Sequence, residues 1–246
     1  MSKYVLIFCL LCLFLIIPSI KCTMEVLPFG LTSLCHAEMV GYWPFNKDDV
    51  AGGKVIDRSG KGHGGVISGA VQETGKKGEA LRFDGSNSYV SIDGLIVKSS
   101  QLSASLWIKK DALSEVHRLI YFDGLLQFGF SDTSLFVHTQ TLNGEDPNLP
   151  YESIGIVAGQ WHHLVVTWDT AAPSDNVKVY VDGDLKLKGT LVKSKGGKIG
   201  IAGLTIGNDK SSSGHGFDGL IDEVAVYDTA LTDEEIKNLY KGEVKP

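Results

Sequence analysis

Cysteine is scarce in this 246-residue chain, and all four cysteines lie within its first 35 positions. Cys9 and Cys12 fall in an apolar run near the start, and Cys22 and Cys35 follow that run. Residues from position 36 onward therefore use neither disulfides nor thiol chemistry. Hydrophobic residues make up 43% of the chain, which is enough apolar material for a core without covalent staples.

A basic excess is also lacking. The chain has 23 Lys and Arg against 29 Asp and Glu, and its net charge is −6. Because phosphate binding needs a basic face, this balance argues against nucleic acid as a partner. Proline is rare, with 7 residues, whereas glycine is frequent, with 29. That combination is typical of a chain with many tight turns.

Common catalytic motifs are missing as well. The sequence contains no G-x-S-x-G nucleophile elbow, no H-E-x-x-H zinc motif and no G-x-x-x-x-G-K-[ST] phosphate loop. We therefore expect a protein that is not an enzyme.

The N-terminal apolar segment predicts a signal peptide. Lys3 precedes an unbroken apolar run over residues 5–17, which is shorter than the ~20 residues that a membrane span needs. We assign residues 1–22 to the signal peptide, and cleavage as late as residue 37 also fits the sequence. The mature protein is then expected to be secreted or held at the cell surface, with no membrane span. Two alternatives stay open: the run is retained as an anchor, or Cys22 carries a lipid.

From residue 39 onward the pattern predicts short strands separated by turns. Ala104, Leu106 and Ile108 alternate with other residue types, and the segment 177–181 alternates in the same way. A period of two is typical of strands whose two faces meet different surroundings. Asp182-Gly183 predicts a two-residue hairpin turn, because both residue types tolerate positive φ angles.

The segment 220–228 predicts a central strand covered on both sides, since both of its faces carry apolar groups. Strict alternation assigns these groups to two faces: Leu220, Val224 and Val226 to one, and Ile221, Ala225 and Tyr227 to the other.

One short helix is expected near the C-terminus. Thr232 and Glu235 form a capping-box pattern, and Gly242 suits the helix stop. The stretch 132–152 is polar and predicts a long rim loop. No second domain is indicated.

Eight segments follow one another in an order that one β-sandwich family shares. They are VGYWPF (40–45), DRSGKGHGG (57–65), GEALRFDG (78–85), YV (89–90), SASLWIK (103–109), GQWHHLVVTWD (159–169), VYVDG (179–183) and GLIDEVAVY (219–227) followed by ALT (230–232). Together they resemble the laminin-G-like jelly roll of the concanavalin-A-like lectin/glucanase superfamily. The resemblance implies an all-β fold, a two-sheet antiparallel jelly-roll sandwich over residues 39–241. It also implies binding more often than catalysis, and calcium is common in the family.

A glycan-cleaving enzyme on the same fold is one alternative. Glucanases with this fold carry a Glu-x-Asp-x-(x)-Glu run on one strand, because hydrolysis with retention needs two close carboxylates. No segment here has that run, and Asp222-Glu223 is the nearest candidate. Adjacent residues of a strand are expected to point to opposite faces, so these two carboxylates should not flank one bond.

Calcium is the expected metal if any binds, and Asp57 and Asp222 are its candidate ligands; no other cofactor is expected. Calcium takes about 6–8 oxygen ligands. Asp57 lies in the early turn, and Asp222 lies in the closing strand, which should run beside the first strand. The two carboxylates are therefore expected near each other. A metal would offset the cost of burying Asp222 among apolar neighbours, and so would Arg58, Arg82 or backbone amides. A second oxygen-rich group lies in the predicted rim loop: Asn143, Glu145, Asp146 and Asn148.

The expected function is binding or adhesion outside the cell, with a carbohydrate or an extracellular protein as the partner. The tryptophans at 43, 107, 161 and 168 would stack on sugar rings if they were exposed. Aromatic residues in alternating strands belong to the core more often, and we expect that here. A purely structural surface module is the remaining alternative.

Overall fold

The alternating segments of the sequence form antiparallel strands in the computed structural model of the chain. It describes residues 22–27, 30–35, 37–112, 117–123, 126–131, 134–139, 148–150, 154–190, 199, 201–208, 215–244 and 246. The chain divides into two units, residues 1–38 and residues 39–246. In the first unit, strands β1 (Cys22–Leu27) and β2 (Gly30–Cys35) form an antiparallel hairpin.

Most of the predicted signal peptide lies outside the described residues, which begin at residue 22. Its assignment therefore stays a prediction. Among the described residues, no helix is both long and apolar enough to cross a bilayer.

One sheet of the second unit, which we call sheet I, has eight strands. Seven run in the order β17, β16, β15, β10, β19, β8, β7, and β3 also pairs with β19. Their bounds are β3 (Met39–Trp43), β7 (Val71–Thr74), β8 (Glu79–Asp84), β10 (Gln101–Lys110), β15 (Trp161–Asp169), β16 (Val177–Val181), β17 (Asp184–Gly189) and β19 (Asp218–Tyr227).

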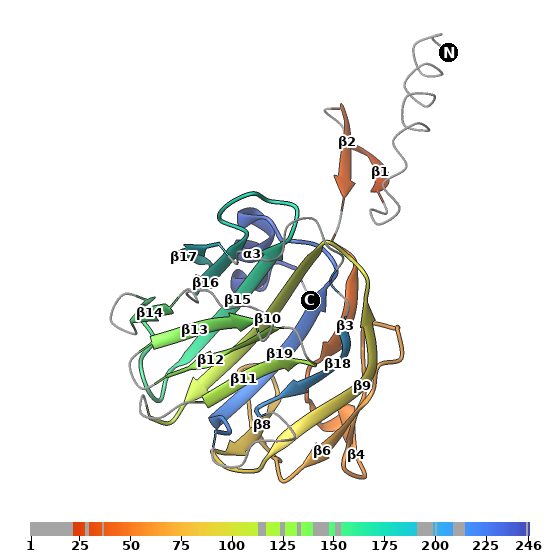
Figure 1. Ribbon diagram of the computed structural model, residues 1–246. Coiled ribbons are helices and arrows are strands. Elements are labelled where there is room, and N and C mark those ends of the chain that lie inside the picture. Colours follow the sequence, from red (N-terminus) through yellow and green to blue (C-terminus); the bar gives the residue numbers. More distant parts are fainter. Residues whose placement is uncertain are drawn as a thin grey trace. The chain divides into compact units, whose positions relative to one another are not determined.

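The other sheet, sheet II, has nine strands in the order β14, β13, β12, β11, β18, β9, β6, β5, β4. Their bounds are β4 (Val50–Ala51), β5 (Lys54–Val55), β6 (Gly65–Ser68), β9 (Tyr89–Val97), β11 (His117–Phe122), β12 (Leu126–Phe130), β13 (Ser134–Thr139), β14 (Asn148–Pro150) and β18 (Ile201–Ile206). A short 3-10 turn, η1 (Lys47–Asp49), precedes β4. Figure 1 shows the two sheets packed face to face, so the predicted two-sheet antiparallel sandwich is confirmed.

The core fills the space between the sheets and follows the alternation in the sequence. Ala104, Leu106 and Ile108 of β10 belong to it, while Ser105 and Trp107 lie on the other face of sheet I. The predicted hairpin is confirmed as well, because Asp182 and Gly183 have φ angles of 53° and 82° between paired residues Val181 and Asp184.

Strand β19 is central, as predicted, and pairs with β10, β8 and β3. Its predicted faces are wrong for Leu220 and Ile221, because Ile221 joins the core with Val224 and Val226 and Leu220 does not. The cause is a β-bulge. Trp107 of β10 lies opposite Asp222 and Ser105 lies opposite Ala225, so β19 carries one extra residue, and Glu223 has a φ of 53°. An inserted residue reverses the alternation on one side of it.

The predicted C-terminal helix is α3 (Asp233–Lys241), with Thr232 as its N-cap and Gly242 in the left-handed region at its end. The helix lies against the outer face of sheet I. The Tyr180 hydroxyl donates a hydrogen bond of 2.7 Å to the Asp233 carboxylate, and the Tyr240 ring stacks on Trp107 with 5.7 Å between centroids.

The predicted rim loop over 132–152 is not a loop throughout, because β13 and β14 lie within it. Pairing of β13 with β14 extends sheet II at this edge.

Reductant should leave the stability of the second unit unchanged, because residues 39–246 contain no cysteine. Thermal melting of this segment with and without dithiothreitol tests the expectation. A melting temperature that falls by more than a few degrees on reduction would contradict it.

Candidate functional site

Asp57 serves as the acceptor that closes the early glycine-rich turn. Its Oδ1 accepts hydrogen bonds from the backbone amides of Tyr42 (3.0 Å) and Ser59 (2.8 Å), and its Oδ2 accepts one from the amide of His63 (2.9 Å). The side chain is 1% exposed. Burial alone would raise the pKa of Asp57, but these hydrogen bonds favour the charged form and the net pKa is lowered.

Asp222 is fully buried and is held by a different segment. Its Oδ2 accepts hydrogen bonds from the amides of Lys76 (2.8 Å) and Lys77 (2.9 Å). Its Oδ1 has no hydrogen-bond partner within the described part of the chain. Burial raises the pKa of Asp222 to about 7; the charge of Glu223 adds to the rise, and the amides oppose it. The sequence suggested a metal, an arginine or backbone amides as the partner of Asp222, and in the structure backbone amides hold it.

Glu223 lies on the same side of β19 as Asp222, although adjacent strand residues were expected to face opposite ways. The bulge at Glu223 is the reason. Its Oε2 accepts hydrogen bonds of 3.0 Å from the hydroxyl of Tyr42 and from Nζ of Lys77. The two carboxylates thus accept hydrogen bonds from the same segment, residues 75–78. Both are buried beneath it, with 0% and 4% exposure.

Asp57 and Asp222 bind separate sets of amides. In the described ranges, no group of three or more His, Cys, Asp or Glu side chains is placed to hold a metal ion. Calcium at this pair stays a prediction. Of the second oxygen-rich group, Asn143, Glu145 and Asp146 lie outside the described residues, and Asn148 begins β14.

The tryptophans and Tyr240 do not form an open platform for sugar stacking among the described residues. Trp43 and Trp168 belong to the core, as expected. Trp107 is buried outside the core, under Tyr240 of α3, and Trp161 is partly exposed, so the expectation is wrong for these two. Tyr240 is 39% exposed, but its ring lies against Trp107 and His163.

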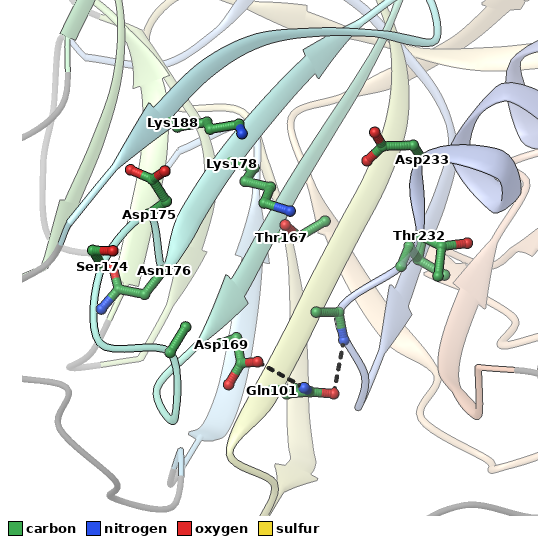
Figure 2. A pocket seen from close by; sticks show the side chains of 13 residues that line it. Gln101, Thr167, Asp169, Ser174, Asp175, Asn176, Lys178, Lys188, Thr232 and Asp233 are labelled. Carbon is green, nitrogen blue, oxygen red and sulfur yellow. Dashed lines mark hydrogen bonds between the residues drawn. The ribbon is translucent and has the colours of Figure 1, made fainter.

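A cavity of about 450 Å³ opens on the outer side of sheet I, beside the start of α3. Figure 2 shows its polar lining. Strands β10, β15, β16 and β17, the turn at 172–176 and the segment 230–233 contribute Gln101, Thr167, Asp169, Ala172, Ser174, Asp175, Asn176, Lys178, Lys188, Ala230, Leu231, Thr232 and Asp233. None of these residues is aromatic.

Hydrogen bonds fix one wall of the cavity. Gln101 donates to the Asp169 carboxylate (2.9 Å) and accepts from the amide of Ala230 (3.3 Å), the two bonds drawn in Figure 2. The other oxygen of Asp169 accepts from the amide of Ala171 (2.9 Å). These bonds tie β10, the end of β15 and the approach to α3 together, so this wall is preorganised.

Three residues form a row across the floor. Thr167 of β15 lies opposite Lys178 of β16, which lies opposite Lys188 of β17. Their neighbours Val166, Val177 and Val179 belong to the core, so the row faces outward. The cavity thus offers hydroxyl and ammonium donors together with carboxylate and amide acceptors.

Sequence reasoning missed this site. A two-residue turn at 182–183 with regular pairing would put Lys178 opposite Leu187. A register shift in the hairpin puts it opposite Lys188 instead. The pattern of outward-facing polar residues was visible in the sequence, but the pairing of the two lysines was not.

A family model described as the concanavalin A-like lectin/glucanases superfamily matches residues 84–237. Among curated proteins, sushi, von Willebrand factor type A, EGF and pentraxin domain-containing protein 1 of Rattus norvegicus is 26% identical over 161 residues, and its Mus musculus counterpart is 24% identical over 166. Each match covers 61% of this chain, and the chain spans about 4% of the length of these relatives.

Among solved structures, domain 4 of AbnA is similar to this chain at 26% identity. AbnA is an extracellular arabinanase from Geobacillus stearothermophilus, and the domain was solved in complex with arabinotriose. The TM-score is 0.62, and the match covers 83% of this chain and 98% of that one. The binding domain of Paraclostridial Mosquitocidal Protein 1 has a TM-score of 0.63 at 15% identity, covering 84% of this chain and 52% of its own. At that identity the similarity shows the fold alone.

Replacing Asp222 by Asn should stabilise the domain relative to wild type as pH rises from 5 to 8. The folded-state pKa of Asp222, about 7, lies above its ordinary value of 3.8. The stability that this group contributes is fully present below pH 3.8 and is lost as pH rises from 3.8 through about 7. Asn keeps an acceptor for the two amides but cannot ionise, so the variant should lack the loss. Melting temperatures at several pH values would measure it.

The informative quantity is the difference between the variant and wild type, because burial lowers the pKa of His163 to about 4 and makes it titrate with the opposite sign. Asp222→Ala is the matched control. It leaves the amides of Lys76 and Lys77 without an acceptor and should destabilise the domain by roughly 1–3 kcal/mol. A variant-to-wild-type difference that is independent of pH would show that Asp222 does not titrate in this window.

Proposed function

Because the chain belongs to the concanavalin A-like lectin/glucanases superfamily, we propose that it is a non-catalytic, extracellular domain that binds carbohydrate in the cavity beside α3. The observation that carries the proposal is the preorganised lining, which presents donors and acceptors together. Sugars carry hydroxyl groups that both donate and accept, so a cavity of this composition can satisfy them. The arabinanase domain, solved with a bound oligosaccharide, supports a carbohydrate ligand and an extracellular location.

Non-catalytic binding is favoured by where the carboxylates lie. Asp222 and Glu223, which the bulge brings to one side, are buried and hydrogen-bonded beneath residues 75–78 and do not line the cavity. Three carboxylates line the cavity, and two of them have protein donors: Asp169 accepts from Gln101 and Ala171, and Asp233 accepts from Tyr180. The third, Asp175, lies alone in the turn at 172–176, so it lacks the close carboxylate partner that hydrolysis with retention needs. Asp169 and Asp233 fix the wall, which is a positioning role. An extracellular protein partner is the competing proposal, and a purely structural module is the third.

Filling the cavity should abolish glycan binding. Ala172→Trp places a large ring at the lining, and Ala51→Trp on β4 of the other sheet is a matched control that leaves the cavity open. Wild type and the control should bind the same members of a glycan array, with and without calcium, and Ala172→Trp should lose them. Absence of any glycan binding by wild type would favour a protein partner, and release of shortened glycans would favour an enzyme.

Calcium is proposed as a clamp between the early turn and the closing strand, acting through Asp57 and Asp222. A ligand that binds only the folded state stabilises it by about 2.7 kcal/mol at a hundred times its dissociation constant. Millimolar calcium should therefore raise the melting temperature, a chelator should lower it, and Asp57→Asn should reduce the response.

The readout must be the calcium-dependent shift, because Asp57 also accepts three backbone hydrogen bonds and its replacement will lower the metal-free melting temperature too. Equal shifts in wild type and variant would place the metal elsewhere. No shift in wild type would mean that the amides alone hold both carboxylates.

A further inference from the structure

Two lysines lie directly opposite each other on the floor of the cavity. Lys178 of β16 pairs with Lys188 of β17, and directly opposite side chains have Cβ atoms only about 4.5–5.5 Å apart. Like charges in that position repel each other. In Figure 2 both ammonium ends point toward the α3 side of the cavity.

Neither lysine forms an ion pair within the described part of the chain. Three aspartates line the same cavity. Asp169 and Asp233 accept hydrogen bonds from protein donors. The third, Asp175, lies in the turn at 172–176 and forms no ion pair with either lysine in the described part of the chain. The nearby Lys186, by contrast, lies 3.8 Å from the carboxylate of Asp184. The donors of Lys178 and Lys188 therefore stay open to an incoming group.

Thr167 continues the row with a hydroxyl. It lies opposite Lys178 across β15 and β16 and is 4% exposed. The cavity, at about 450 Å³, falls within the range of about 300–1,000 Å³ that is usual for small-molecule sites. It is larger than an inorganic anion requires, and its carboxylates suit hydroxyl groups. The composition fits a polyhydroxyl ligand with one acidic group.

We propose that this cavity binds an anionic glycan, whose carboxylate or sulfate group lies between the ammonium groups of Lys178 and Lys188. The inference rests on the proposed carbohydrate-binding function. Charge-assisted hydrogen bonds to the acidic group account for selectivity, and the aspartate-lined wall accepts hydrogen bonds from the hydroxyls.

Three probes separate the possibilities: arabinotriose is neutral, trigalacturonate carries carboxylates, and a κ-carrageenan tetrasaccharide carries sulfates but no carboxylates. Calorimetric titration of the full chain with each probe, at low and high salt, gives the affinities. At least one acidic probe should bind more tightly than arabinotriose, with an affinity that falls as salt rises. Which acidic probe binds identifies the group.

The test variants are Lys178→Gln and Lys188→Gln, and Lys186→Gln is the matched control. The control removes the same charge from β17 at a residue that does not line the cavity. Each test variant should weaken the acidic probe by about tenfold, or ~1.4 kcal/mol. The control should change its affinity by less than twofold. Unchanged melting temperatures would show that the variants are folded.

Each outcome decides between the two proposals. Preferred binding of an acidic probe that both test variants weaken supports the anionic ligand. Preferred binding of arabinotriose, or binding that the test variants leave unchanged, overturns it while the carbohydrate function stands. Absence of binding to all three probes and to every member of the glycan array overturns the carbohydrate function, and this inference with it.

Discussion

The outer face of sheet I is arranged around two adjacent carboxylates that its central strand has to bury. An ionised carboxylate without donors is costly in the interior, so Asp222 and Glu223 need partners that reach them. Residues 75–78 provide these, through the amides of Lys76 and Lys77 and the ammonium of Lys77. The approach is so close that a Cβ on Gly75 would lie 2.7 Å from Asp222 Oδ2. The turn before β8, the bulge in β19 and Tyr42 of β3 are thus one hydrogen-bonded assembly.

This assembly determines which part of the outer face is closed. Trp107 lies opposite Asp222 in the sheet, with Lys76 Nζ 4.3 Å from its ring centroid and Tyr240 of α3 stacked on it. His163 lies beside them and bonds the buried Ser105 hydroxyl at 2.9 Å. The centre of the face is therefore sealed by side chains and by the helix. The open part lies toward β15, β16 and β17, where the cavity is.

Local patterns in the sequence predicted the fold well, because alternation, turn residues and the capping box each act over a few residues. The hairpin at 182–183, helix α3 and the core positions of β10 were all found this way. The misplaced faces of β19 and the missed pairing of Lys178 with Lys188 share one cause. Bulges in β19 and in the β16–β17 hairpin each add one residue to one strand. A bulge is stabilised by contacts between residues far apart in sequence, such as Glu223 with Tyr42, so the two-residue alternation of the sequence does not reveal it.

The positions of the two cavity lysines distinguish a role in ligand binding from a role in protecting the sheet edge. Edge strands commonly carry lysine because its charge blocks pairing with another chain. That reason suits Lys186 and Lys188 on the edge strand β17, but it does not apply to Lys178, since β16 is paired on both sides. The bulge in the hairpin aligns Lys178 with Lys188 and leaves Lys186 beside Asp184. The proposed anionic ligand supplies a reason for a positive charge that lies on an inner strand, opposite a like charge and facing a cavity.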